Sequence, residues 1–263
     1  MEEYTNDCKN CSKEPAGRIN VSRFISALDE CFSKNDLAMA GKLIDVWAEE
    51  AKALDDERGL LSVYNEGLGY YRRTGDEEKA MATVEAVDEL IKSVGIADKV
   101  SGATIYVNLA TTLKAFGRVE RALKYYSLAE NVYLANDMQS SFEYSALLNN
   151  RASAFGDLKK YDDAELNLLI ATEILKEDGT HDAEVAVGLI NLAHCVYDRN
   201  ENDTDRVEKL LDEAWDYLNS SRCPRDAGYA FIISKCAPSL RYFNRVDEAE
   251  ALEAVAAVIY GKK

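Results

Sequence analysis

The stretch that decides the fold is residues 101–136, SGATIYVNLATTLKAFGRVERALKYYSLAENVYLAN. Its first half places Leu109, Leu113 and Phe116 four and three residues apart, which is the spacing of one face of an α-helix. Gly117 then interrupts this pattern, and a second amphipathic segment follows. The stretch therefore predicts two helices joined by a short turn.

The same pattern recurs along the chain. In six segments a charged start is followed by a small or apolar residue in one register, at intervals of 40, 42, 42, 46 and 39 residues. The aligned residues are Ala40, Ala80, Ala122, Ala164, Leu210 and Ala249. Because periods of roughly 20–50 residues are the signature of repeat folds, the sequence predicts six helix-turn-helix units and an all-α architecture.

The apolar periodicity and the polar turns also predict where these helices begin and end. The first helices of the units are expected over residues 20–34, 57–73, 99–116, 140–157, 182–198 and 226–243, and the second helices over 36–54, 76–94, 118–136, 161–177, 204–219 and 245–260. We expect residues 1–18 to form a flexible N-terminal tail and residues 19–263 to form the repeat domain. Pro238 cannot donate a hydrogen bond to the carbonyl of Ser234, so we expect a kink there.

Composition excludes several classes of protein. With 263 residues, 47% hydrophobic and 30% charged, the chain is too apolar to be disordered and is long enough to bury a core. Its 47 acidic and 31 basic residues leave a net charge of −16, which repels a nucleic-acid backbone. Only 3 prolines and 14 glycines are available for turns, which disfavours a many-stranded β fold.

The N-terminal sequence and the cysteines indicate the compartment. The acidic start lacks the basic flank and apolar run of a signal peptide, and no stretch approaches the 18 apolar residues of a membrane span, so we expect a cytoplasmic protein without membrane contact. The six cysteines are irregularly placed, which predicts free thiols. Cys8 and Cys11 form a CxxC, but no second pair follows at zinc spacing, which favours an ordinary tail over a metal or redox site.

Motifs for catalysis and cofactors are missing from the sequence. It contains no phosphate-binding loop, no dinucleotide fingerprint, no zinc-protease motif and no nucleophile elbow, and its only histidines are His181 and His194. The loop of residues 198–205 begins like a calcium loop, but Asp203 stands where the turn glycine belongs and Lys209 where the bidentate glutamate belongs. We therefore predict a non-enzymatic protein that uses no metal and no cofactor.

Residues 108–110, 117, 122 and 191–193 resemble the motif of the tetratricopeptide repeat (TPR) family, and the resemblance extends over about residues 20–260. Its small residue in the first helix of each unit matches Gly67, Ala110, Ala152, Ala193 and Ala237. Intervals of 40 and 42 residues resemble the long-repeat variety found in kinesin light chains and bacterial peptide-sensing regulators. Leu210, Pro238 and the first unit depart from the pattern. The resemblance implies a right-handed α–α superhelix of about six units.

An asparagine recurs at one place in four successive first helices, although asparagine is unfavourable inside a helix because its side chain competes for backbone groups. Three residues later, a polar residue shares its face in three of these helices. Two interpretations remain open: the asparagines pack neighbouring helices, or they contact a ligand. In the resembled family this stripe lines the concave groove and contacts the main chain of a bound peptide. The resemblance therefore implies a binding set of Asn65, Asn108, Thr111, Asn150, Ser153, Asn191, His194 and Lys235.

Tyrosines are frequent in the repeats, and we interpret them mainly as core residues rather than ligand contacts. The residues concerned are Tyr70, Tyr71, Tyr125, Tyr126, Tyr197 and Tyr242.

These observations predict a scaffold that holds an extended peptide or a partner protein in the concave groove. The alternatives are a peptide-responsive sensor acting through a partner and, third, an enzyme or metal protein that uses the N-terminal thiols. The net charge of −16 favours a neutral or basic partner. Residues 254–260 are apolar on every side of the last helix, so two outcomes are open: the N-terminal tail folds back over its outer face, or that face pairs with a second copy in a homodimer.

Overall fold

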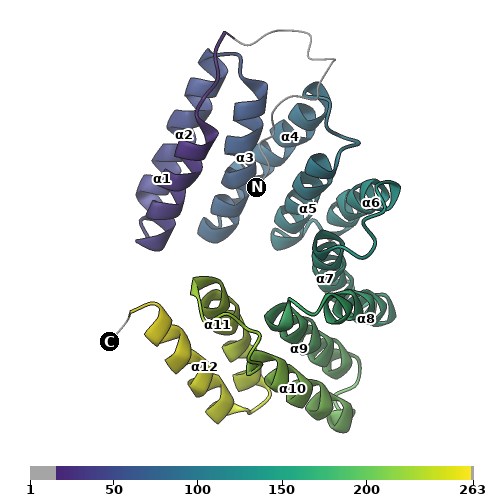
Figure 1. Cartoon of the computed structure of the whole chain (residues 1–263). Helices are drawn as coiled ribbons and strands as arrows, with labels where there is room; N and C mark the ends of the chain where they lie inside the picture. The colour runs from purple at the N-terminus through teal and green to yellow at the C-terminus, as the bar shows by residue number, and fades with distance from the viewer. Residues whose placement is uncertain (1–15, 262–263) are drawn as a thin grey trace. The chain divides into compact units, whose positions relative to one another are not determined.

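The computed structural model describes residues 16–261, and within this range the chain forms twelve α-helices and no strand (Figure 1). The predicted helices are confirmed, each within two residues at either end. The helices are α1 (Val21–Ser33), α2 (Leu37–Ala53), α3 (Glu57–Thr74), α4 (Glu77–Ser93), α5 (Val100–Ala115), α6 (Val119–Ala135), α7 (Phe142–Asp157), α8 (Tyr161–Asp178), α9 (Asp182–Arg199), α10 (Thr204–Leu218), α11 (Ala227–Tyr242) and α12 (Val246–Ile259).

The chain divides into two compact units, unit 1 (Met1–Asp137) and unit 2 (Met138–Lys263). Each odd-numbered helix packs against the next even-numbered helix, which gives three helical pairs in each unit. Within unit 1, α3 also contacts α2 and α5, and within unit 2, α9 also contacts α7, α8 and α11. This succession of packed pairs confirms the all-α helix-turn-helix repeat architecture.

Short turns with one left-handed residue join the helices of most pairs. Gly117, which the sequence marks as the break between two helices, has φ = 74°, a conformation that residues with a Cβ rarely adopt. Asn35, Lys159 and Asn244 occupy the same conformation in three other pairs, with φ between 54° and 62°. In two pairs the second helix begins with an aspartate cap: the side chain of Asp36 caps α2, and that of Asp76 caps α4 by accepting a hydrogen bond from the backbone N–H of Lys79 at 3.1 Å.

The small residues of the repeat register lie in the core. Ala40, Ala80, Ala122, Ala164 and Ala249 are at most 2% exposed, so the paired helices approach closely at these positions. The sixth position differs, because Leu210 is only partly buried.

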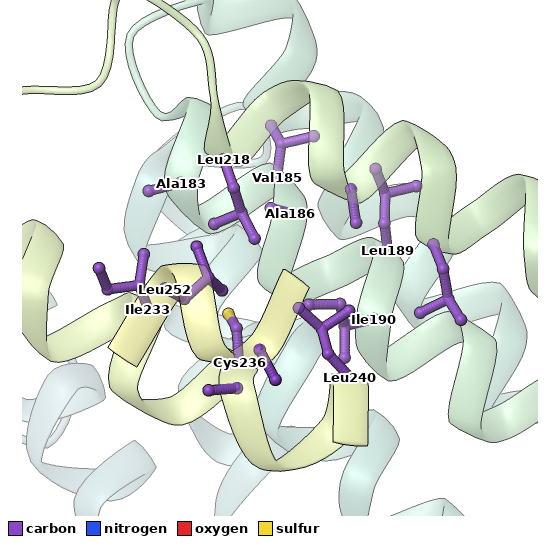
Figure 2. Close-up of a cluster of buried hydrophobic side chains, with 14 of the residues drawn as sticks. Ala183, Val185, Ala186, Leu189, Ile190, Leu218, Ile233, Cys236, Leu240 and Leu252 are labelled. Atoms are coloured by element: carbon purple, nitrogen blue, oxygen red, sulfur yellow. The ribbon is translucent and has the colours of Figure 1, made fainter. Parts of the chain in front are cut away.

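The core of the last two pairs is continuous. Side chains from α9, α10, α11 and α12, among them Ile190, Leu218, Leu240 and Leu252, point toward one another (Figure 2). α11 runs without a break through Pro238, which lies on its exposed side. These contacts give α9 and α11 a fixed relation to each other within unit 2.

The structure bears on the expectations for the cysteines, for membrane spans and for the last helix. Cys8 and Cys11, like most of the expected tail, lie outside the described residues. Among the described residues, Cys31, Cys195, Cys223 and Cys236 are free thiols, and all four are buried. None of the helices in the described range is both long and apolar enough to span a bilayer. Val258 on α12 is 79% exposed, and homodimerisation through this helix stays a prediction.

Candidate functional site

In unit 1 the recurring asparagines of α3 and α5 are bonded to each other. Nδ2 of Asn108 donates a hydrogen bond to Oδ1 of Asn65 at 2.9 Å, which joins two neighbouring repeats. The Asn65 amide nitrogen in turn lies 3.5 Å from Oε1 of Glu66. One turn further along α5, the Thr111 hydroxyl donates to the carbonyl of Val107 at 2.8 Å. The predicted polar stripe of unit 1 is therefore an ordered, half-buried set of side chains.

The Asn65–Asn108 pair leaves hydrogen-bonding capacity unused. A side-chain amide has two N–H donors and one carbonyl acceptor, and Asn108 uses one donor for Asn65. The side chain of Asn108 makes no other hydrogen bond within the described residues. Its second N–H and its Oδ1 are therefore available, and the bond to Asn65 fixes the orientation of the amide that carries them.

Two charged residues of α3, which the sequence does not single out, share this stripe. Burial raises the pKa of Glu66, against the hydrogen bond from Asn65 that lowers it. Burial also lowers the pKa of Arg72, and this arginine makes no ion pair or hydrogen bond in the part of the chain that the structure describes. Arg72 follows Asn65 by seven residues and so shares its helix face, which is its sequence signal, whereas Glu66 joins the stripe through its contact with the Asn65 amide. A partly desolvated charge without a counter-charge marks a candidate binding position.

In unit 2 the asparagine pair involves a residue that the sequence reasoning missed. Nδ2 of Asn191 donates to Oδ1 of Asn149 at 3.0 Å, whereas Asn150 is the residue in register with the repeat. The side chains of Asn150 and Ser153 make no hydrogen bond within the described residues. Neighbouring helix positions differ by about 100° in direction, so the rotation of α7 decides which asparagine meets α9. Asn150 is left half-buried with its whole amide available.

The last two predicted residues of the set lie beside aromatic rings. The His194 ring is 4.6 Å from that of Phe243 and 5.2 Å from that of Tyr242, measured between centroids. Burial lowers the pKa of His194, and the nearby charge of Asp198 opposes this shift. The ammonium group of Lys235 lies 5.4 Å from the centre of the Phe231 ring. The polar stripe therefore gives way to aromatic contacts toward α11.

Of the six tyrosines, three lie in the core as predicted, Tyr70 and Tyr197 are partly buried against it, and Tyr242 is exposed. Tyr71, Tyr125 and Tyr126 are at most 8% exposed and belong to the core. Tyr242 was expected there too, but it is 59% exposed because it ends α11 at the surface.

Comparison with known proteins identifies the class of fold. No protein-family model matches the sequence, and no curated protein matches it either. Solved structures do match: BtubC (BKLC) from P. vanneervenii is 20% identical, with 93% of this chain and 92% of that chain covered and a TM-score of 0.51. The TPR-like repeats of a putative kinesin light chain from Podosopora anserina are 17% identical, with 77% and 95% covered and a TM-score of 0.54.

A third similar structure is that of a Rap protein complexed with competence and sporulation factor. It is 11% identical, with 92% of this chain and 77% of that chain covered and a TM-score of 0.58. At these identities the similarity concerns the fold, and it confirms the resemblance to TPR-like helical repeats. The chain is a TPR-like repeat protein in architecture.

Proposed function

We propose that this chain is a non-enzymatic scaffold whose repeats hold an extended peptide, or an extended segment of a partner protein. The observation that carries the proposal is the set of half-buried asparagines with unused hydrogen-bonding groups: Asn108 in unit 1, and Asn150 and Asn191 in unit 2. An amide with a free N–H and a free carbonyl oxygen can bond both the C=O and the N–H of a peptide main chain without reading its sequence.

The bonds between neighbouring asparagines support binding as well as packing. Asn65 holds the amide of Asn108, and Asn149 holds that of Asn191, at 2.9 and 3.0 Å. A side chain that is already oriented loses less conformational freedom when a ligand binds, which raises affinity. The pairs thus combine the two interpretations of the sequence: one half of each amide packs the repeats and the other half is left for a ligand.

The charge of the chain supports a neutral or basic partner. A net charge of −16 attracts positive groups over a distance of about one Debye length, ~8–10 Å at physiological salt. The Rap structure, which contains competence and sporulation factor, provides a precedent for ligand binding by a fold of this kind.

The test uses retention of peptides from a random decapeptide mixture on the immobilised full-length chain, read by mass spectrometry. We expect Asn150→Ala to weaken the binding of the retained peptides by about 1–2 kcal/mol, which is the scale of lost hydrogen bonds. The melting temperature should change little. Asn131→Ala provides the matched control, because Asn131 is an exposed asparagine on α6, away from the stripe. Unchanged retention in both Asn150→Ala and Asn108→Ala, with a clear loss of stability in Asn108→Ala, whose amide bonds Asn65, would show that the asparagines only pack helices.

A further inference from the structure

Four rings gather where α9 meets the end of α11. Tyr197 and Tyr242 are 5.9 Å apart with ring planes at 89°, and Tyr242 and Phe243 are 5.0 Å apart at 86°. His194 packs against the last two. Rings at right angles present one face and one edge to the space between them, so an aromatic corner forms at the surface of unit 2.

A cavity of about 180 Å³ opens beside this corner. Its walls come from three helices and the residue after one of them: Tyr197 of α9, Thr204, Val207 and Glu208 of α10, Tyr242 of α11, and Phe243. All of these residues belong to unit 2, and α9 packs against both α10 and α11. The cavity is therefore supported by helices that share one core.

The charges around the cavity are negative. Glu208 in its wall is bound by Arg245 at 2.5 Å, but the same arginine also binds Asp212 at 2.6 Å and Glu248 at 3.1 Å. One guanidinium thus serves three carboxylates, which leaves an excess of negative charge beside the aromatic corner.

The end of α9 and the loop that follows it add to this excess. Asp198 of α9 and Glu201 of the loop make no ion pair within the described residues, and Arg199 between them binds Asp162 and Glu165 of α8. Burial and the neighbouring Tyr197, followed by the charges of Asp198 and Glu201, raise the pKa of the Tyr242 phenol. Both carboxylates therefore act on a ring that lines the cavity.

Elsewhere the chain places its own cations over aromatic rings. The guanidinium of Arg225 lies 4.3 Å from the centre of the Tyr229 ring, and Lys235 covers Phe231. No cation of the described residues stands over Tyr197, Tyr242 or Phe243. Aromatic faces next to unpaired carboxylates attract a cation by both the ring quadrupole and the charge, and the same carboxylates repel an acidic group.

We propose that this cavity binds the basic side chain, lysine or arginine, of the peptide held by the scaffold. The inference rests on the proposed function and specifies its partner. Asn191 and Tyr197 are separated by six residues of α9, which is about 9 Å along the helix axis.

The experiment measures binding of small probes to the full-length chain by NMR, with N-acetyl-arginine amide and N-acetyl-lysine amide as cations and N-acetyl-citrulline amide as the neutral isostere. We expect either cation to shift the Tyr197 and Tyr242 ring signals, with citrulline amide about tenfold weaker. Tyr242→Ala removes a ring and is expected to abolish the shift, whereas Tyr242→Phe keeps it. The double variant Asp198→Asn with Glu201→Gln changes two exposed residues outside the core. It should weaken the binding of both cationic probes and leave the binding of citrulline amide unchanged.

Equal binding of citrulline amide, or no shift of these rings by either cation, overturns the inference. The sequences of the peptides retained from the random mixture show whether the inference or the proposed scaffold function has failed. Retained peptides without enrichment of lysine or arginine overturn the inference and leave the proposed function standing. Cation binding at the corner without retention of any peptide overturns the proposed function instead. A basic enrichment that disappears in Tyr242→Ala supports both.

Discussion

Asp56 is a buried carboxylate that holds two parts of unit 1 together, and its replacement by alanine tests the structure most directly. It is only 4% exposed. Its Oδ1 accepts from the backbone N–H of Gly59 at 3.0 Å, which caps α3, and its Oδ2 accepts from the backbone N–H of Ile19 at 3.0 Å, which ties the segment before α1 to the second repeat. A Cβ on Gly59 would lie 2.3 Å from Oδ2, so the carboxylate fits only beside a glycine.

The expected loss follows from these two bonds. Removing a helix cap costs about 0.5–2 kcal/mol, and leaving a buried N–H without a partner costs about 1–3 kcal/mol. Asp56→Ala should therefore lower the free energy of unfolding by about 2–4 kcal/mol. Asp56→Asn keeps one acceptor oxygen and should lose about half as much. Asp36 provides the control, since its exposed carboxylate makes a single capping bond, to Met39 at 2.9 Å, and Asp36→Ala should cost about 1 kcal/mol.

Urea unfolding followed by circular dichroism measures these differences, and hydrogen exchange of the Ile19 amide shows whether the loss is local. We expect the order Asp56→Ala, Asp56→Asn, Asp36→Ala from the largest loss to the smallest. If Asp56→Ala costs no more than Asp36→Ala and the Ile19 amide keeps its protection, the double role assigned to Asp56 is refuted.

Three further predictions concern a titration, the thiols and two glycines. Because burial lowers the pKa of His194 below its usual 6.5, the unfolded chain binds more protons than the folded chain near that pH. Stability to urea should therefore fall as the pH is lowered from about 7.5 to 5.5, and it should fall by less in His194→Gln. An identical fall in both proteins would contradict the assignment. Burial raises the pKa of Cys195 to about 11 and that of Cys236 to about 12, so peptide mapping after thiol alkylation should find both unmodified in the native chain at pH 7.5 and modified in urea. Gly102→Ala would place a Cβ 2.0 Å from a backbone carbonyl oxygen and should destabilise the chain by about 1–3 kcal/mol or more. The Cβ of Gly156→Ala meets nothing within 4 Å, so this change should stabilise α7 by about 0.4–1 kcal/mol. Melting temperatures of the two variants that shift in the same direction would be inconsistent with this packing.

The helices and their bounds could be predicted from the sequence because they depend on local periodicity. A helix repeats every 3.6 residues, so apolar spacing and turn residues along about 20 positions predict its bounds without knowledge of any distant contact. Gly117 marks a turn because few other residues adopt its φ of 74°. The repeated alanines likewise mark where paired helices meet, and Ala40, Ala80 and Ala122 are completely buried.

The candidate site was only partly predictable, since its contacts join residues that are far apart in the sequence. The sequence alone determined that asparagines recur in the first helices, but the tertiary structure decided that Asn191 bonds Asn149 and leaves Asn150 without a partner among the described residues. It also decided that Tyr242 meets Tyr197 across 45 positions of the chain, beside a cavity. Such contacts depend on the rotation and approach of each helix against its neighbour, because a change of one residue in register turns a side chain by about 100°.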